Sequence, residues 1–203
     1  MPIQPKQERS RKRPSQILKA ALQEFSARGF SDCRLEDVAS RVGISKGTIY
    51  RYFPNKEELF CAVIQHQVVE RLKHLDELTA THEGSIELFL RSKLIPFFQA
   101  FLASDARHVA RLVMAEGPKF PQVAEFYYRE VVQKGTGILR GLIEKGVERG
   151  EFRRTDLSDF PQLIMAPALM ALIWNSLFSD FRPLDLSRLL HTHIDLLLEG
   201  LKS

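Results

Sequence analysis

The chain has 203 residues, of which 44% are hydrophobic and 27% charged, so it can bury a sizeable core and disorder over its length is excluded. Its two cysteines, Cys33 and Cys61, lie 28 residues apart without a CxxC spacing, which argues against a disulfide scaffold or a zinc site. The net charge of +4 is uneven, because residues 1–60 carry 12 Lys and Arg against 7 Asp and Glu, whereas residues 61–203 carry 17 against 18. A basic first third predicts an anionic partner there, either nucleic acid or a membrane surface.

Membrane insertion is not expected from the apolar segments. Residues 1–16 lack the apolar run of a signal peptide, and the longest apolar run, LIMAPALMALIW at 163–174, is too short to span a bilayer and contains a proline. These observations predict a soluble protein of a reducing compartment that does not span a membrane.

The predicted fold is all-α with about nine helices. Apolar residues recur at helical spacing nearly everywhere, and no useful stretch alternates apolar and polar residues. Pro14 suits the first position of a helix that Gly29 ends. Helices are expected over residues 14–28, 35–42, 45–52, 56–81, 86–104, 106–117, 121–150, 157–180 and 186–201.

Residues 42–56, VGISKGTIYRYFPNK, combine a helix stop, a short turn and a new helix start. Gly43 can take the left-handed conformation that closes a helix, and Ser45 can cap the next one. Ala39 is small where the two helices would cross, and Ile49 fills the corner between them. This pattern predicts a helix-turn-helix.

The second helix of this motif has a polar outer side. Lys46, Thr48, Tyr50 and Tyr52 there suit the phosphate oxygens and base edges of a DNA major groove, and Lys56 is placed for another phosphate. Ahead of the first helix, residues 1–13 are predicted to be a flexible basic arm that follows the DNA backbone or enters a minor groove. The cationic residues of this arm that are assigned to DNA are Arg11, Lys12 and Arg13.

Residues 14–64 resemble the DNA-binding domain of TetR/AcrR-type transcriptional regulators. The resemblance lies in the pattern AA…F…GF…LEDVA…GISKGTIYRYFPNKEELF, which covers about a quarter of the chain. It implies a helix-turn-helix DNA-binding domain over residues 14–60 and a helical ligand-binding and dimerisation domain over residues 61–203. It also implies a cytoplasmic homodimer that binds a palindromic operator, usually as a repressor, and has no membrane partner. A small ligand would control it by changing the spacing of the two DNA-binding domains.

The resemblance also assigns individual residues to the DNA interface. Gly47 would let the backbone approach the duplex, and Arg51 stands at a variable position suited to reading bases. The family often has Thr or Ser where the second helix begins, but Cys33 and Arg34 stand here, so Arg34 is a candidate phosphate contact and Asp32 a candidate cap. The DNA-facing positions carried over from the family are Ser45, Lys46, Gly47, Thr48, Tyr50, Tyr52 and Lys56.

The last two predicted helices are candidates for a dimer interface. Residues 157–180 are apolar on nearly every side, which predicts burial on both faces, and Pro167 should kink or interrupt that helix. Residues 186–201 carry a leucine-rich seam near heptad spacing. Two such helices from each of two chains would form a four-helix interface, and the alternative is that both fill the core of one chain.

A small-molecule inducer, if one exists, is expected to be apolar or aromatic and to bind among the fourth to eighth helices. Most of the aromatic residues there should belong to the core, and a minority should line a cavity. The candidate ligand-binding residues are Phe89, Phe97, Phe101, His108, Arg111, Met114, Phe126, Tyr127, Met165 and Trp174.

No catalytic or cofactor motif is present. His66, His74 and His82 lie eight apart and do not share a helix face, so no metal site is predicted, and no cofactor is expected. The three glycines of GTGILRG, residues 135–141, are expected to thin a helix where another packs closely. Two alternatives stay open: a DNA-binding regulator controlled by a protein partner or by its own abundance, and a helical enzyme, which the missing catalytic spacings disfavour.

Overall fold

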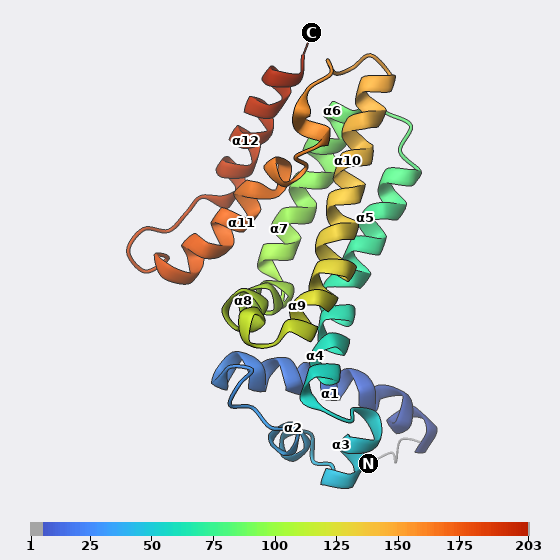
Figure 1. The fold of residues 1–203 in the computed structure, drawn as a ribbon, viewed down its shortest axis with the longest axis vertical. Helices are drawn as coiled ribbons and strands as arrows, with labels where there is room; N and C mark the ends of the chain where they lie inside the picture. The colour runs from blue at the N-terminus through green and yellow to red at the C-terminus, as the bar shows by residue number, and fades with distance from the viewer. Residues whose placement is uncertain (1–5, 203) are drawn as a thin grey trace, which may run out of the picture. The chain divides into compact units, whose positions relative to one another are not determined.

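The computed structural model describes residues 6–202, and side chains from Arg13 onward. Within that range there is no strand, and nine continuous helices account for the fold (Figure 1), as predicted. Three of the nine are interrupted by a π-helical segment. The elements are α1 Lys6–Arg28, α2 Leu35–Val42, α3 Lys46–Tyr52, α4 Lys56–Ile64, η1 Gln65–Val69, α5 Glu70–Ala80, α6 Ile86–Phe89, η2 Leu90–Leu94, α7 Ile95–Ala103, α8 Ala106–Glu116, η3 Gly117–Lys119, α9 Pro121–Tyr127, η4 Tyr128–Val132, α10 Gln133–Glu148, η5 Asp156–Ser158, α11 Gln162–Leu177 and α12 Leu186–Leu201.

The contacts divide the chain into two compact units that do not follow chain order. Unit 1 comprises residues 1–70 and 108–130, and unit 2 comprises residues 71–107 and 131–203. Most of α8 and all of α9 therefore pack with the N-terminal helices. The functional division predicted from the sequence, at residues 13 and 60, stays a prediction, because compactness does not test which residues bind DNA or a ligand.

The first helix begins earlier than predicted. It starts at Lys6, so residues 6–13, expected to belong to a flexible arm, are helical, and Pro14 lies inside the helix. The Lys, Gln, Glu and Arg residues ahead of Pro14 have high helix propensity, whereas the missing N–H of the proline removes only one intrahelical bond. The N-terminal part of the predicted arm, residues 1–5, lies outside the described residues.

The π-helical segments follow from the spacing of the core residues. Across η1 the pairs of neighbouring buried residues step by five, from Val63 and Ile64 to Val68 and Val69. Within α4 they step by four, from Leu59 and Phe60 to Val63 and Ile64. An α-helix would rotate these residues off the core side, and a π-helical turn accommodates the extra residue. Steps of five from Phe89 to Leu94 and from Leu90 to Ile95 coincide in the same way with η2.

Four phenylalanines form the centre of unit 1. Phe25 at the end of α1, Phe30 after it and Phe60 in α4 contact one another with ring centroids 5.1–5.2 Å apart. Phe120, directly before α9, packs edge-on against Phe30 at 4.5 Å. This cluster holds α1 and α4 together and attaches the 108–130 segment to them.

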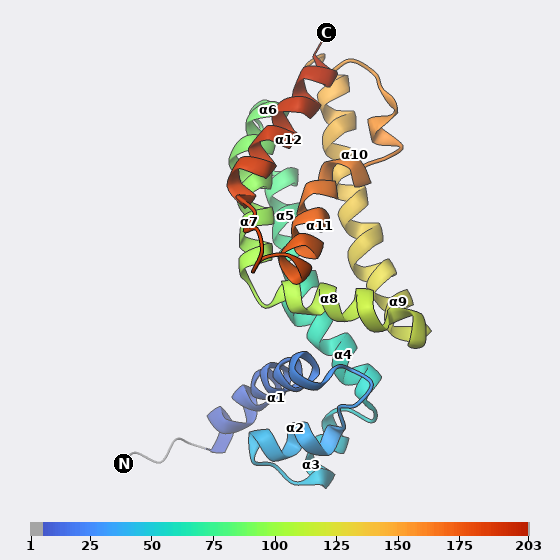
Figure 2. The same cartoon turned by 90° about the vertical axis from the view of Figure 1, so that its left-hand side faces the viewer.

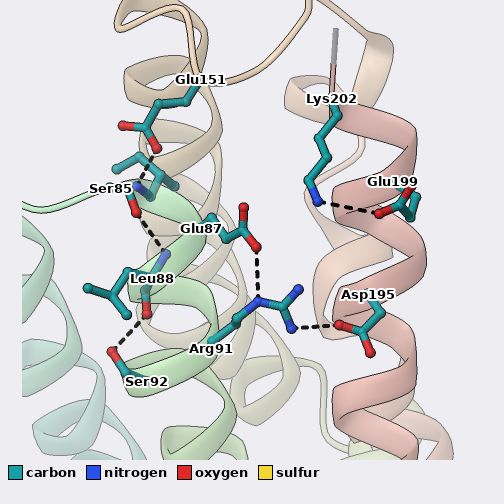
Figure 3. Close-up of polar contacts among 10 residues, drawn as sticks. Ser85, Glu87, Leu88, Arg91, Ser92, Glu151, Asp195, Glu199 and Lys202 are labelled. Atoms are coloured by element: carbon teal, nitrogen blue, oxygen red, sulfur yellow. Dashed lines mark hydrogen bonds and ion pairs between the residues drawn. The ribbon is translucent and has the colours of Figure 1, made fainter.

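In unit 2, α12 lies along α7 and α11 (Figure 2). A polar bridge reinforces this packing (Figure 3): the Arg91 guanidinium lies 3.1 Å from Glu87 Oε1 on its own helix and 2.5 Å from Asp195 Oδ1 of α12. Glu151 Oε2 accepts the backbone N–H of Ile86 at 2.6 Å, and the Ser85 hydroxyl accepts that of Leu88. These two acceptors satisfy backbone N–H groups of the first turn of α6 that have no partner within the helix.

The prediction that α11 is buried on both faces stays a prediction, because a single chain does not test whether a second chain covers the helix. In one chain Ile164, Ala168, Ala171 and Leu172 are buried, whereas the opposite face is exposed. That exposed face comprises Leu163, Leu169, Met170, Ile173 and Leu177. The helix is also shorter than predicted, since residues 156–158 form a separate 3₁₀ turn, and it continues through Pro167.

Only one glycine of the α10 region makes the close approach expected for residues 135–141, and it lies outside that range. A Cβ at Gly137 or Gly141 would meet no atom within 4 Å, and one at Gly135 would make an ordinary contact of 3.7 Å with Leu72. A Cβ at Gly146 would overlap the buried Phe152 ring.

Candidate nucleic-acid interface

The turn between α2 and α3 forms through local backbone chemistry. Gly43 has a φ of 72° and its N–H bonds the Ser40 carbonyl, while the Ile44 N–H reaches the Ala39 carbonyl. This arrangement closes α2 in the left-handed manner that glycine permits without strain. The Ser45 Oγ then accepts the Thr48 N–H at 3.2 Å, which caps α3 as predicted.

The start of α2 is capped differently from the prediction. Asp37, not Asp32, supplies the carboxylate: its Oδ2 accepts the Arg34 N–H at 3.0 Å, and the Asp37 N–H bonds back to the Arg34 carbonyl at 3.1 Å. This reciprocal pair satisfies two backbone groups without a hydroxyl at the helix start. The Arg34 side chain is exposed and does no capping.

Four predicted residues share the outer side of α3. The Ser45 and Thr48 hydroxyls lie 2.8 Å apart, and the Lys46 Nζ lies 5.6 Å from the centre of the Tyr50 ring one turn later. Ser45, Lys46 and Tyr50 are exposed, whereas Ile49 is fully buried beneath them. The helix therefore presents donors and acceptors of the kind that phosphates and base edges require, on a rigid support.

A carboxylate that the sequence did not single out joins this group. Glu36 of α2 accepts hydrogen bonds through its Oε1 from Lys46 Nζ at 2.7 Å and from the Tyr50 hydroxyl at 3.1 Å. The Lys46 bond is the main cause that lowers the pKa of Glu36 to about 2 and raises that of Lys46. No local pattern signals this contact, because it depends on how α3 crosses α2.

Gly47, Arg51 and Tyr52 occupy the rest of the helix. No protein atom lies within 4 Å of a Cβ placed at Gly47, so the backbone there is open to an approaching molecule. The Arg51 guanidinium is exposed and lies 5.7 Å from the Tyr52 ring centre. Arg13 is exposed in α1, and the side chains of Arg11 and Lys12 lie outside the described part of the chain.

Lys56, at the start of α4, faces the domain itself. Its Nζ donates to the Phe30 carbonyl at 2.9 Å and to the Ser31 carbonyl at 2.8 Å. It also lies over the Phe30 ring at 4.8 Å and the Phe120 ring at 5.3 Å. Two of its three N–H donors therefore fasten the loop that follows α1, which the sequence did not predict.

Glu24 is the buried charge of this region. Its carboxylate, 4% exposed, lies 2.5 Å from the Arg41 guanidinium in the last turn of α2 and 3.3 Å from that of Arg28. A buried carboxylate needs such partners to remain charged. The contact ties α1 to α2, the helix against which α3 packs.

An open hollow of about 620 Å³ lies between the starts of α2 and α4. It is lined by residues 31–36, Tyr50 and residues 54–57. Its cations, Arg34 and Lys56, are balanced by acidic residues in the same two segments, so the lining as a whole carries no excess of positive charge.

The ten ligand candidates do not gather in one unit. His108, Arg111, Met114, Phe126 and Tyr127 belong to unit 1, and Phe89, Phe97, Phe101, Met165 and Trp174 belong to unit 2. Two of them have evident packing roles. Phe89 is fully buried against His82, and Trp174 donates its indole N–H to the Arg182 carbonyl at 2.8 Å. Burial raises the pKa of the Tyr127 hydroxyl to about 12.

The described residues contain neither a candidate membrane span nor a candidate metal site. No helix there has the length and apolar character needed to cross a bilayer. Among the same residues, no group of three or more His, Cys, Asp and Glu is arranged to bind a metal ion.

The fold and the outer face of α3 define the chain as a helix-turn-helix DNA-binding protein. Residues 17–63 match the family model of bacterial regulatory proteins of the tetR family, and residues 83–183 match that of the tetracyclin repressor-like C-terminal domain. The two models together match most of the chain, which therefore belongs to the TetR family of DNA-binding transcriptional regulators.

Individual relatives agree along most of their length. The uncharacterized HTH-type transcriptional regulator YfiR of Bacillus subtilis is 27% identical over 195 residues, 88% of this chain and 86% of the relative. The fatty acid metabolism regulator protein of the same organism is 25% identical, over 70% and 73% of the two chains. The crystal structure of Bacillus subtilis FadR in complex with stearoyl-CoA superposes with a TM-score of 0.75, at 19% identity, over 92% and 98%.

Proposed function

We propose that the protein is a cytoplasmic homodimeric repressor that binds a palindromic operator through α3 and is released by a small apolar or aromatic ligand. The observation that carries the DNA-binding part is the group formed by the exposed Ser45, Lys46 and Tyr50 and the half-buried Thr48 on a helix anchored by the buried Ile49. Arg51 would read bases, and Gly47 would admit the DNA backbone. Arg11, Lys12, Arg13, Arg34, Tyr52 and Lys56 would add phosphate contacts.

The dimer interface is proposed to lie on α11 and α12. Leu163, Met170 and Leu177 are exposed at seven-residue spacing on α11, and Leu196 on α12 is 68% exposed. An apolar face of this extent on unit 2 favours burial against an identical face of a second copy, since two-fold symmetric contacts are the commonest in oligomers. Two copies would present two α3 helices, which matches a palindromic site.

The ligand class is inferred from this chain's aromatic and apolar residues and from its relatives. One relative is a fatty acid metabolism regulator and another was crystallised with stearoyl-CoA. A long-chain acyl thioester is therefore the first compound to test, with apolar aromatic compounds second.

Selection of bound duplexes from a random DNA pool at physiological salt tests the DNA-binding proposal. Enrichment of a palindrome by the wild type, and a changed preference for Arg51→Ala, are expected. Lys93→Gln, which removes one exposed cation from η2 in unit 2, is the matched control and should enrich the same site. Absence of enrichment by the wild type would refute sequence-specific binding.

The selected duplex then serves to test release. Stearoyl-CoA below its micelle-forming concentration should lower operator binding, and coenzyme A without an acyl chain should not. If neither the acyl thioester nor apolar aromatic compounds release the DNA, control by a protein partner or by abundance becomes the better account.

A further inference from the structure

The carboxylate of Glu36 occupies two of the groups through which α3 would meet DNA. One oxygen, Oε1, accepts both the Lys46 ammonium at 2.7 Å and the Tyr50 hydroxyl at 3.1 Å. Lys46 and Tyr50 are one helical turn apart on the exposed side of α3, and Glu36 reaches them from the neighbouring α2. The Glu36 side chain is itself 36% exposed, so its charge stands at the surface that faces DNA.

A DNA phosphate and this carboxylate compete for the same donors. Both are anions that accept charge-assisted hydrogen bonds from an ammonium, and only one can take the Lys46 donor in its present direction. A phosphate that approached the pair would also be repelled by the carboxylate. Because the pKa of Glu36 is held near 2, this negative charge persists at every pH at which DNA binding is measured.

We propose that Glu36 is a specificity-determining residue that acts as an internal competitor for DNA phosphates by holding Lys46 and Tyr50 back from duplexes of arbitrary sequence. This inference rests on the proposed role of α3 in DNA binding. On a well-fitting site, the additional base and backbone contacts offset the separation of Lys46 from Glu36. On other sequences no additional contacts offset the loss of the Lys46–Glu36 bond, so binding to those sequences is weakened selectively. Glu36 would thus provide specificity by disfavouring the wrong DNA.

The size of the effect follows from counterion release. Each phosphate neutralised by a cation contributes about −0.9 to the slope of log Kobs against log salt, so one freed lysine tightens binding about eightfold at 0.1 M salt. By comparison, removal of one surface charge that does not contact Lys46 should change the binding constant less than about twofold, because its field is screened over about 10 Å at that salt.

Three variants and a 30-base-pair duplex of arbitrary sequence test the proposal. Glu36→Gln keeps the shape and removes the charge, and Lys46→Met removes the competed-for cation. Asp32→Asn is the matched control, because Asp32 lines the same hollow as Glu36 but is not a partner of Lys46 or Tyr50. Thermal melts of each variant check that unit 1 is folded.

The expected result is that Glu36→Gln binds the arbitrary duplex about eightfold more tightly at 0.1 M salt, with a slope steeper by about 0.9. The gain should disappear in a Lys46→Met background and be absent in Asp32→Asn. On an enriched operator the gain should be smaller, so that the ratio of operator to arbitrary binding falls.

Other results would overturn it. Unchanged or weaker binding by Glu36→Gln would mean that Glu36 merely orients Lys46 and Tyr50. An equal gain in Asp32→Asn, or one that persists with Lys46→Met, would reduce the effect to net charge. A wild type that binds duplexes without sequence preference would contradict the proposed function alone, since the arbitrary-duplex comparison still decides the role of Glu36. A wild type that binds no duplex would refute both.

Discussion

Replacement of Lys56 by methionine separates two roles that one side chain can combine. The structure uses two of the three N–H donors of Lys56 on the Phe30 and Ser31 carbonyls and leaves the third for a phosphate. Methionine retains most of the apolar stem and removes the charge. We therefore expect Lys56→Met to lose stability and one DNA contact together.

The stability loss can be worked from these contacts. A hydrogen bond from a charged donor contributes about 1.5–3 kcal/mol, and a cation over an aromatic ring about 0.5–1 kcal/mol at exposed sites. Water can replace the lysine at the exposed Ser31 carbonyl, so the expected net loss is about 2–3 kcal/mol. For a chain of this size, that corresponds to a fall in Tm of roughly 4–12 °C.

Two assays report the two roles. Thermal unfolding at fixed protein concentration measures the first, and the salt dependence of operator binding, at a temperature where both proteins are folded, measures the second. The slope should become shallower by about 0.9. Lys19→Met, at an exposed position of α1, should change stability by less than about 0.5 kcal/mol. Unchanged stability in Lys56→Met would refute the role in fastening the loop, and an unchanged slope would refute the phosphate contact.

Three further predictions concern stability, assembly and acid. Gly146→Ala should lower the free energy of unfolding by about 1–3 kcal/mol, because the added methyl group meets the Phe152 ring. Gly141→Ala, with open space around it, should raise the free energy of unfolding by about 0.5–1 kcal/mol. Equal denaturant midpoints for the two variants would contradict this packing. Met170→Glu should shift the sedimentation coefficient towards that of a monomer, whereas Leu88→Glu, at an equally exposed position on α6, should leave it unchanged. A shift with Leu88→Glu and none with Met170→Glu would place the interface elsewhere. The Glu36 carboxyl should titrate near pH 2 by NMR. Because its folded pKa lies below the ordinary 4.5, its stabilising effect is present above pH 4.5 and is lost as the pH falls towards 2; a midpoint above 4 would show that the Lys46 pair does not form in solution.

The parts of the fold that local chemistry determines could be predicted from the sequence. The stop at Gly43 and the cap at Ser45 depend only on neighbouring backbone groups, so the bounds of α2 and α3 follow closely. The start of α1 could not be predicted in this way. Proline favours a first helical turn but is also tolerated further in, when strong helix formers precede it.

The sequence pattern could not predict the contacts between helices. The bonds of Glu36 to Lys46 and of Lys56 to the Phe30 carbonyl depend on crossing angles that periodicity does not encode. The sequence also left open which chain covers the second apolar face of α11. Apolar residues all around a helix predict burial, but they do not say whether the covering surface comes from the same chain.

The π-helical turn η1 has a consequence for the tolerance of this protein to changes in length. Because core residues on its two sides are separated by steps of five, removal of one residue there would leave a regular α-helix with both apolar faces still aligned. His66, which is exposed, is the residue whose deletion costs least. The same deletion in the middle of α5 would turn all that follows by about 100°. Changes of chain length should therefore be tolerated better in η1 and η2 than in the regular α-helical turns, because each of these two segments already contains one residue more than an α-helix requires.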